Sequence, residues 1–451
     1  MAFPKDFVWG AAAASYQIEG GAFEDGKGLS VWDTMCRKEH AIKEGHTGEV
    51  ACDHYHRYKE DVGLMKEIGL KAYRLSISWP RVIPNGRGVV NEKGLAFYDR
   101  LIDELLAAGI TPFVTLFHWD FPQELMSSGG WLSEDSPQWF ADYTRVVVDR
   151  LSDRVTNWMT LNEPQCTVAL GHQTGAHAPA LKLSPPEQLR VMHHLLMAHG
   201  RAVQMLRSAC KSKPTIGWAP VGEVAYPHSH SQEDLEAAQR KAMSSGRSFW
   251  TNTMFSDPVC LGHYPEDGLR AWGSDMPAVS SADLETIHQP LDFYGLNIYQ
   301  GRPVRAAADG SPVEVPRPPG YPITAMPWPI EPLSLYWGPR FIYERYKLPV
   351  YITENGMAGI DWVATDGKVH DDHRIDFTKR YLRELRRAIE DGIDVRGYFH
   401  WSIMDNFEWA EGYTKRFGLI HVDYTNQKRT PKESTWWYQR VIATNGAALD
   451  E

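Results

Sequence analysis

Apolar and polar positions follow a repeating pattern along this chain. In residues 97–108 the apolar side chains recur every three or four positions, which predicts an amphipathic helix. Gly109 follows at the point where helices commonly end in a left-handed residue. The next apolar segment, residues 111–117, is short enough for a buried strand. The repeating unit is therefore a helix followed by a strand.

The same unit recurs over the length of the sequence. Helices are predicted at residues 61–68, 97–108, 138–151, 338–346 and 376–391. Strands are predicted at residues 8–15, 72–79, 111–117, 155–162, 215–220, 291–297, 350–354 and 395–401. Strands that alternate with helices form parallel βαβ units, and eight of them favour a single (β/α)8 TIM barrel domain with long βα loops over residues 1–451. A doubly wound open sheet is the alternative.

Composition and charge narrow the class of protein. The 451 residues are 43% hydrophobic and 12% aromatic, which is enough for a large buried core. A formal net charge of −10 argues against a nucleic-acid partner, because binding phosphate needs clustered basic residues. The five cysteines have no CxxC spacing. They argue against a zinc site and predict a reducing, cytoplasmic compartment.

No membrane association is predicted from the sequence. It contains no apolar run of about 18 residues, the length that would span a bilayer. Its N-terminus also lacks the basic and then apolar pattern of a signal peptide, so we expect a folded domain from the start. Both a monomer and a homo-oligomer remain compatible with the sequence.

Polar and aromatic residues gather at the carboxyl ends of the predicted strands. They are Gln17, Arg74, His118, Trp119, Asn162, Glu163, Asn297, Tyr299, Glu354, Asn355 and Trp401. In a closed barrel these ends meet on one face, where barrel enzymes place their chemistry. A single glutamate at a strand end is commonly a solvated cap, but this many polar ends together favour a functional site.

The chemistry of this set points to a sugar. Carbohydrate hydroxyls need side chains that donate and accept hydrogen bonds, and a pyranose face packs on indole rings. The chain has 17 tryptophans, and Trp119, Trp401 and Trp409 lie beside the polar residues. No metal is expected, because the pairs His54/His56 and His228/His230 lack a third ligand. Cys166 lacks the partners of a thiol nucleophile and is predicted to line the pocket.

Six motifs in one order carry a resemblance to a known family. They are FVWGAAAASYQIEG (7–20), YRLSISW (73–79), LFHW (116–119), TLNEP (160–164), YITENG (351–356) and HWSIMDNFEW (400–409). Over almost its full length the chain resembles glycoside hydrolase family 1, the β-glucosidases and their relatives. The resemblance implies hydrolysis with retention, through a covalent glycosyl-enzyme and without a cofactor. The expected substrates are oligosaccharides such as cellobiose, and aryl or alkyl glucosides, cleaved at terminal non-reducing β-D-glucosyl residues.

The resemblance also assigns roles to individual residues. Glu163 matches the acid/base and Glu354 the nucleophile, and Arg74, Asn297 and Tyr299 match the group around the nucleophile. The residues expected to bind substrate are Gln17, His118, Trp119, Asn162, Trp401, Glu408, Trp409, Trp328, Phe417, Cys166 and His172, with Trp328 on the leaving-group side. His172 and Ala180 depart from the family pattern, which more often has tyrosine and glycine there.

The surroundings of Glu163 and Glu354 should give the two carboxyls different protonation states. We expect Arg74 and Tyr299 to keep Glu354 ionised. We expect the resulting anion, together with burial, to keep Glu163 protonated.

Three alternative functions stay open at this point. In 6-phospho-β-glycosidases, serine, lysine and tyrosine stand where this chain has Glu408, Lys415 and Phe417, and an anionic Glu408 would repel a phosphate. A broad β-galactosidase or β-fucosidase of the same fold is a second alternative. A non-catalytic sugar-binding module is the third, although both carboxylates stand in intact motifs.

Overall fold

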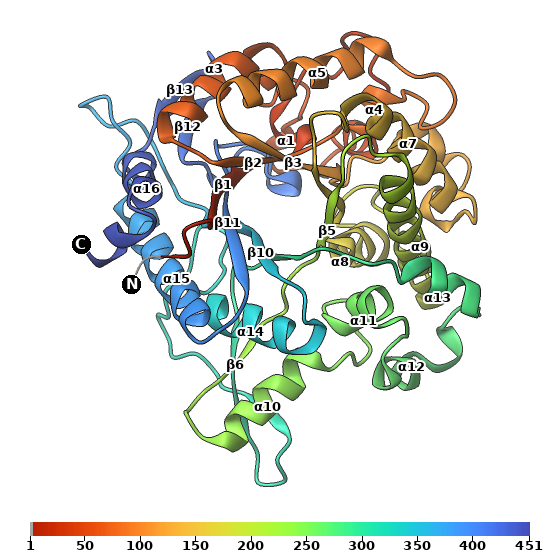
Figure 1. Cartoon of the computed structure of the whole chain (residues 1–451), viewed down its shortest axis with the longest axis vertical. Coiled ribbons are helices and arrows are strands. Elements are labelled where there is room, and N and C mark those ends of the chain that lie inside the picture. The colour runs from red at the N-terminus through yellow and green to blue at the C-terminus, as the bar shows by residue number, and fades with distance from the viewer. Residues whose placement is uncertain (1–2) are drawn as a thin grey trace.

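Eight parallel strands form one sheet at the centre of the molecule, with helices around it (Figure 1). The computed structural model describes residues 3–451, so the first two residues of the predicted domain lie outside it. The strands are β1 (Val8–Ala12), β2 (Ala72–Ser76), β3 (Thr111–Phe117), β4 (Asn157–Asn162), β5 (Thr215–Ala219), β7 (Tyr294–Asn297), β10 (Val350–Asn355) and β11 (Val395–Trp401). Each falls within, or within one residue of, a predicted strand.

The order of the strands shows that the sheet is a barrel. Neighbours follow the order β5-β4-β3-β2-β1-β11-β10-β7, and all of them pair in parallel. The edge strands β5 and β7 approach each other as well. The backbone N–H of Asn297 donates to the carbonyl of Pro220 at 3.1 Å, and that of Gly222 donates to the carbonyl of Asn297 at 2.8 Å. The predicted TIM barrel is confirmed, and the open doubly wound sheet is wrong.

Long helices cover the outside of the barrel. The helices are α1 (Ser15–Ile18), α2 (Val31–Met35), α3 (His54–Ile68), α4 (Trp79–Val82), α5 (Glu92–Ala107), α6 (Gln123–Met126), α7 (Ser136–Leu151), α8 (Pro164–Val168), α9 (Pro185–Ala209), α10 (Gln232–Met243), α11 (Thr253–Leu261), α12 (Glu266–Trp272), α13 (Ser281–Ile287), α14 (Ser334–Tyr346), α15 (Asp372–Glu390) and α16 (Glu433–Ala443). All five predicted helices are present. All five begin earlier than predicted, and most of their first turns contain polar residues that do not show in an apolar pattern.

Two small sheets lie outside the barrel. One contains β6 (Ala225–Pro227), β8 (Arg302–Ala306) and β9 (Pro312–Glu314), and the other pairs β12 (Ile420–Asp423) with β13 (Lys428–Pro431). No helix within residues 3–451 has the length and apolar character to cross a membrane.

An ion cluster joins the loops that follow β10 and β11. Its members are Asp361, Asp371, Arg374, Asp405, Arg416 and Lys432, and all but Arg416 are buried. The Nζ of Lys432 lies 2.6 Å from Asp361 and 2.7 Å from Asp405. Arg374 also donates to the backbone carbonyls of Met357, after β10, and Phe417, after β11. Three carboxylates and three cations balance in charge, so the cluster can hold both loops without an unpaired buried ion.

Removing the central cation of this cluster should destabilise the fold. In Lys432→Met the buried carboxylates of Asp361 and Asp405 lose a shared partner, which should lower the free energy of unfolding by about 3–5 kcal/mol. The midpoint and slope of chemical denaturation measure this change. The control is Lys368→Met, which removes a mostly exposed partner of Glu433 and should change stability by less than about 1 kcal/mol. Equal midpoints for the two variants would contradict the role given to the cluster.

Candidate active site

The carboxyl ends of the barrel strands open into a pocket of about 530 Å³. Most of the residues that the sequence singled out line it: His118, Trp119, Glu163, Cys166, Asn297, Tyr299, Trp328, Glu354, Trp401, Glu408, Trp409 and Phe417. The strand ends predicted to meet on one face therefore do meet. The pocket combines carboxyl groups, among them Glu163, Glu354 and Glu408, with several aromatic rings.

Three further predicted residues, Gln17, Arg74 and Asn162, support the lining from behind. The Nε2 of Gln17 donates to Glu408 Oε2 at 3.3 Å and to the carbonyl of Phe407 at 2.9 Å. The Nη2 of Arg74 donates to Asn162 Oδ1 at 2.5 Å. These side chains are buried, and their contacts fix the orientation of the groups in front of them.

Glu354, at the end of β10, is surrounded by donors. The guanidinium of Arg74 donates to Oε1 at 2.5 Å, and the hydroxyl of Tyr299 donates to Oε2 at 2.7 Å. Burial raises the pKa of Glu354, and Arg74, Tyr299 and Asn297 oppose that rise. A cation on one oxygen and a hydroxyl on the other favour the ionised form of this carboxyl.

Glu163 stands between β4 and α8 and accepts hydrogen bonds from neutral donors. The amide of Asn297 donates to Oε1 at 2.8 Å, and the thiol of Cys166 donates to Oε2 at 3.1 Å. Burial, and then the charge of Glu354, raise the pKa of Glu163 to about 7. The two carboxyls therefore differ: the donors around Glu354 favour its charged form, whereas Glu163 retains a proton in a large share of molecules at neutral pH.

The third carboxyl, Glu408, differs from the anionic group that the sequence suggested. Burial and the charges of Glu354 and Glu163 raise its pKa to about 8, against the opposing hydrogen bond from Gln17. At pH 7 the side chain is therefore largely neutral. The sequence does not predict this neutral state, because the burial and the proximity of three carboxyls appear only in the folded chain.

Aromatic rings form the wall beside Glu408. The ring of His118 stacks on Trp401 with centroids 5.7 Å apart and on Trp409 at 5.9 Å. Burial lowers the pKa of His118 well below its ordinary value, so the imidazole is neutral. On another side of the pocket, Trp328 lies against Tyr299 at 5.0 Å and Phe417 at 6.0 Å.

Three residues of the pocket have left-handed backbone conformations. Their φ angles are 76° at Trp119, 43° at Glu163 and 50° at Trp409. Such values are uncommon for bulky residues and cost free energy. Packing in the barrel must hold them, which makes the direction of these three side chains a fixed property of the site.

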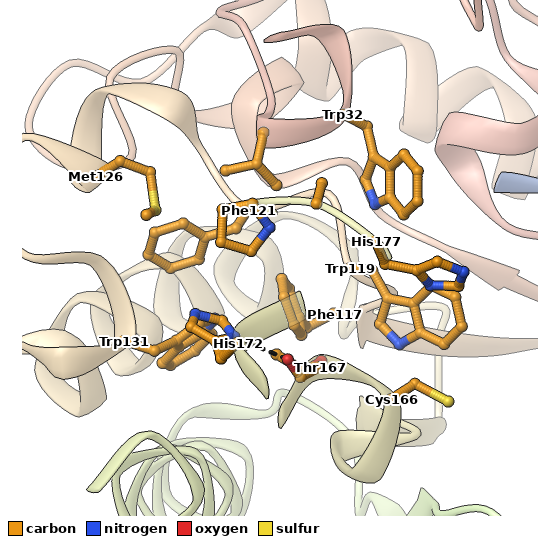
Figure 2. A pocket seen from close by; sticks show the side chains of 13 residues that line it. Trp32, Phe117, Trp119, Phe121, Met126, Trp131, Cys166, Thr167, His172 and His177 are labelled. Carbon is orange, nitrogen blue, oxygen red and sulfur yellow. Dashed lines mark hydrogen bonds between the residues drawn. The ribbon is translucent and has the colours of Figure 1, made fainter. Parts of the chain in front are cut away.

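His172 does not join the pocket, although the sequence grouped it with the substrate-binding residues. It lies in a second, smaller cavity that is mostly apolar, beside Trp131 (Figure 2). Its Nδ1 lies 2.7 Å from the carbonyl of Thr167, and burial lowers its pKa to about 4. Trp119, Cys166 and His177 line both cavities.

The outer lining of the pocket contains residues that the sequence did not predict. These residues are Leu170, Ala176, His177, Val221, Gly222, Glu223, Val224, Trp250, Gln300, Gly301, Arg302, Met326, Ala410 and Glu411. Most lie in loops, where no strand or helix periodicity predicts which side chain faces inward. Within residues 3–451, no group of three or more His, Cys, Asp or Glu side chains is arranged to hold a metal ion.

Comparisons with known proteins agree with this geometry. A family model described as glycosyl hydrolase family 1 matches residues 1–447. Beta-glucosidase A of Thermotoga maritima is 45% identical over 449 residues, which cover 98% of both chains. Beta-glucosidase A of Acetivibrio thermocellus is 43% identical over 452 residues, with 99% of both chains covered. The structure of a beta-glucosidase from Thermotoga maritima in complex with glucoimidazole matches 99% of both chains with a TM-score of 0.91 at 45% identity.

Removing the hydroxyl next to Glu354 should change the titration of that carboxyl. Tyr299→Phe deletes a hydrogen bond to the charged form, so the pKa of Glu354 should rise by about 1 pH unit. Infrared difference titration of the carboxyl bands measures the shift. The control is Tyr343→Phe, on helix α14 and away from the pocket lining, which should leave the bands unchanged. A shift to lower pKa in Tyr299→Phe would contradict the assignment.

Proposed function

The chain belongs to glycosyl hydrolase family 1, and on that basis we propose that it is a retaining β-glucosidase with Glu354 as nucleophile and Glu163 as acid/base. The observation that carries the proposal is the unequal environment of these two carboxyls in one pocket. Glu354 accepts from a guanidinium and a phenol, whereas Glu163 accepts from an amide and a thiol. The first arrangement suits a nucleophile, and the second suits a proton donor.

The first half of the reaction uses the two carboxyls together. The ionised Glu354 attacks the anomeric carbon while Glu163 gives its proton to the glycosidic oxygen. The bond to the leaving group breaks, and a glycosyl ester forms on Glu354. Arg74 and Tyr299 hold the carboxylate of Glu354 in place, so little reorganisation is needed as its charge moves into the new bond.

The second half reverses the role of Glu163. Once Glu354 is esterified its charge is gone, and one cause of the raised pKa of Glu163 disappears. Glu163, now a carboxylate, takes a proton from water, and the water oxygen attacks the anomeric carbon. The ester bond breaks, the sugar leaves with its original configuration, and both carboxyls return to their starting states.

The proposed substrate is a terminal β-D-glucosyl residue. The support is that the relatives described above are named beta-glucosidases and that one of them binds glucoimidazole. Gln17, His118, Asn162, Glu408 and Trp409 are proposed to bind the sugar hydroxyls, with Trp401 as the platform for the ring. Trp328 and Phe417 are proposed to contact the leaving group of cellobiose or of an aryl glucoside.

The chemistry of the pocket does not favour a phosphorylated sugar. A phosphate dianion next to Glu408 would share a buried pocket with the carboxylate of Glu354 and would face like charge there. Lys415, the cation nearest in sequence, donates instead to the carbonyl of Ala325 at 2.6 Å and lies 3.6 Å from Glu411.

The domain organisation and the compartment are also proposals. A single barrel domain over residues 1–451 is supported by one core cluster that extends from Phe3 to Leu449. A reducing, cytoplasmic location is supported by the five cysteines, since all of them are free thiols.

The role of Glu354 is tested by removing its side chain. Glu354→Ala should lower kcat for an aryl β-glucoside by about 10⁴-fold or more, because the covalent step is lost. Added azide should fit the space left and restore part of the turnover, with an α-glucosyl azide as the product by NMR. Glu344→Ala, on the outer helix α14, serves as the control and should keep full activity. Near-normal turnover in Glu354→Ala would overturn the proposal.

The pH dependence of kcat/KM should follow the two carboxyls. For phenyl β-glucoside, activity requires protonated Glu163, so kcat/KM should fall as the pH rises through about 7. It should also fall as the pH drops below the raised pKa of Glu354, because the nucleophile then gains a proton. In Glu163→Gln, the residual activity should lack the fall of kcat/KM at high pH, which is the basic limb of the profile. A basic limb that survives this substitution would assign the titration to another group.

A further inference from the structure

The two oxygens of Glu163 have different partners, and this places the catalytic proton. The hydroxyl of Thr353 donates to Asn297 Oδ1 at 2.6 Å, which fixes the orientation of the amide. Its Nδ2 must then point at Glu163 Oε1, 2.8 Å away, as a donor. An oxygen that accepts this hydrogen bond is the poorer place for the acid proton. The proton of the acid form therefore belongs on Oε2.

The neighbour of Oε2 is the thiol of Cys166, with Sγ at 3.1 Å. Cys166 lies three residues after Glu163 in helix α8, and its backbone N–H donates to the carbonyl of Glu163 at 2.9 Å. The first helical turn thus fixes the distance between the two side chains. In Figure 2 the side chain of Cys166 points away from Trp131 and His172, at the side of the smaller cavity where Trp119 and His177 also lie.

The thiol remains protonated throughout the reaction. Burial, and then the charge of Glu163, raise the pKa of Cys166 well above its ordinary value. Its S–H is therefore a permanent neutral group beside an oxygen that gains and loses a proton. A thiol is both a weak donor and a weak acceptor, so it can face either form of the carboxyl.

We propose that Cys166 is a positioning residue for the acid/base, whose S–H donates to Oε2 of Glu163 in the carboxylate form and turns away from Oε2 in the protonated form. This inference rests on the role proposed for Glu163 above. No bond to carbon or sulfur forms or breaks at Cys166. Its effect is to set the free-energy difference between the acid and the base forms of its neighbour.

The weakness of the thiol as a donor is what suits it to this position. A hydroxyl would bind the carboxylate more strongly and would reduce the share of the acid form at neutral pH. An alanine would leave Oε2 of the carboxylate buried without a donor, and the base form needed in the second half of the reaction would be less stable. The thiol stabilises the carboxylate form of Glu163 less than a hydroxyl would and more than an alanine would.

The test compares two substitutions that should shift the same pH limb in opposite directions. For phenyl β-glucoside, the basic limb of kcat/KM should move to lower pH in Cys166→Ser and to higher pH in Cys166→Ala, each by about half a pH unit. Cys210→Ser, at the end of helix α9, is the control and should keep the wild-type limb. A purely structural role would change the height of the profile without moving the limb.

A spectroscopic signature checks the same inference in the unmodified protein. The S–H stretching band that disappears in Cys166→Ala should shift to lower frequency in the wild type as the pH rises through the titration of Glu163. The inference would be overturned if the basic limb of kcat/KM stayed in place in both Cys166 variants or moved in the same direction in both. An S–H band that does not change with pH would overturn it as well.

Glu163→Gln distinguishes a failure of the role proposed for Cys166 from a failure of the role proposed for Glu163. If its residual activity keeps the basic limb, Glu163 is not the titrating acid, and the proposed function fails. If the limb disappears there but does not move in the Cys166 variants, only the role of the thiol fails.

Discussion

The ion pair between Arg74 and Glu354 is the interaction on which the pocket depends. A buried carboxylate is stable only with a partner, and Arg74 supplies a full positive charge at 2.5 Å. The charge that this pair retains on Glu354 then acts on its neighbours. Burial, and then this charge, raise the pKa of both Glu163 and Glu408, so three glutamates in one pocket titrate differently. Their distinct proposed roles depend on this burial and on where one guanidinium is placed.

The position of Arg74 depends in turn on the closed barrel. The residue lies on β2, and its guanidinium reaches Thr115 on β3, Asn162 on β4 and Glu354 on β10. The strand β10 is not a neighbour of β2 in the sheet, since β1 and β11 lie between them. The contact therefore crosses the interior of the barrel. An open sheet would leave these groups far apart, and the burial that shifts the pKa values would be absent.

Much of this arrangement could be predicted from the sequence. The physical reasons for that also explain which residues and charge states could not be predicted. Buried parallel strands form apolar runs, so all eight strands were found, and their ends marked Glu163 and Glu354. His172 was misplaced among the pocket residues because the turn after α8 directs it into another cavity. The neutral state of Glu408 and the outer lining by Glu223, Trp250 and Arg302 arise from long-range packing. Local periodicity carries no information about such contacts.

The shared electrostatics of the three glutamates keep Glu408 in one state along the proposed reaction. Burial, and then the charges of Glu354 and Glu163, raise its pKa to about 8. When the charge of Glu354 passes into the bond with the sugar, Glu163 becomes a carboxylate because it gives up its proton. One charged neighbour is exchanged for another and the burial is unchanged, so the pKa of Glu408 remains raised. A protonated Glu408 both donates and accepts hydrogen bonds, which suits it to the sugar hydroxyls before and after the covalent step.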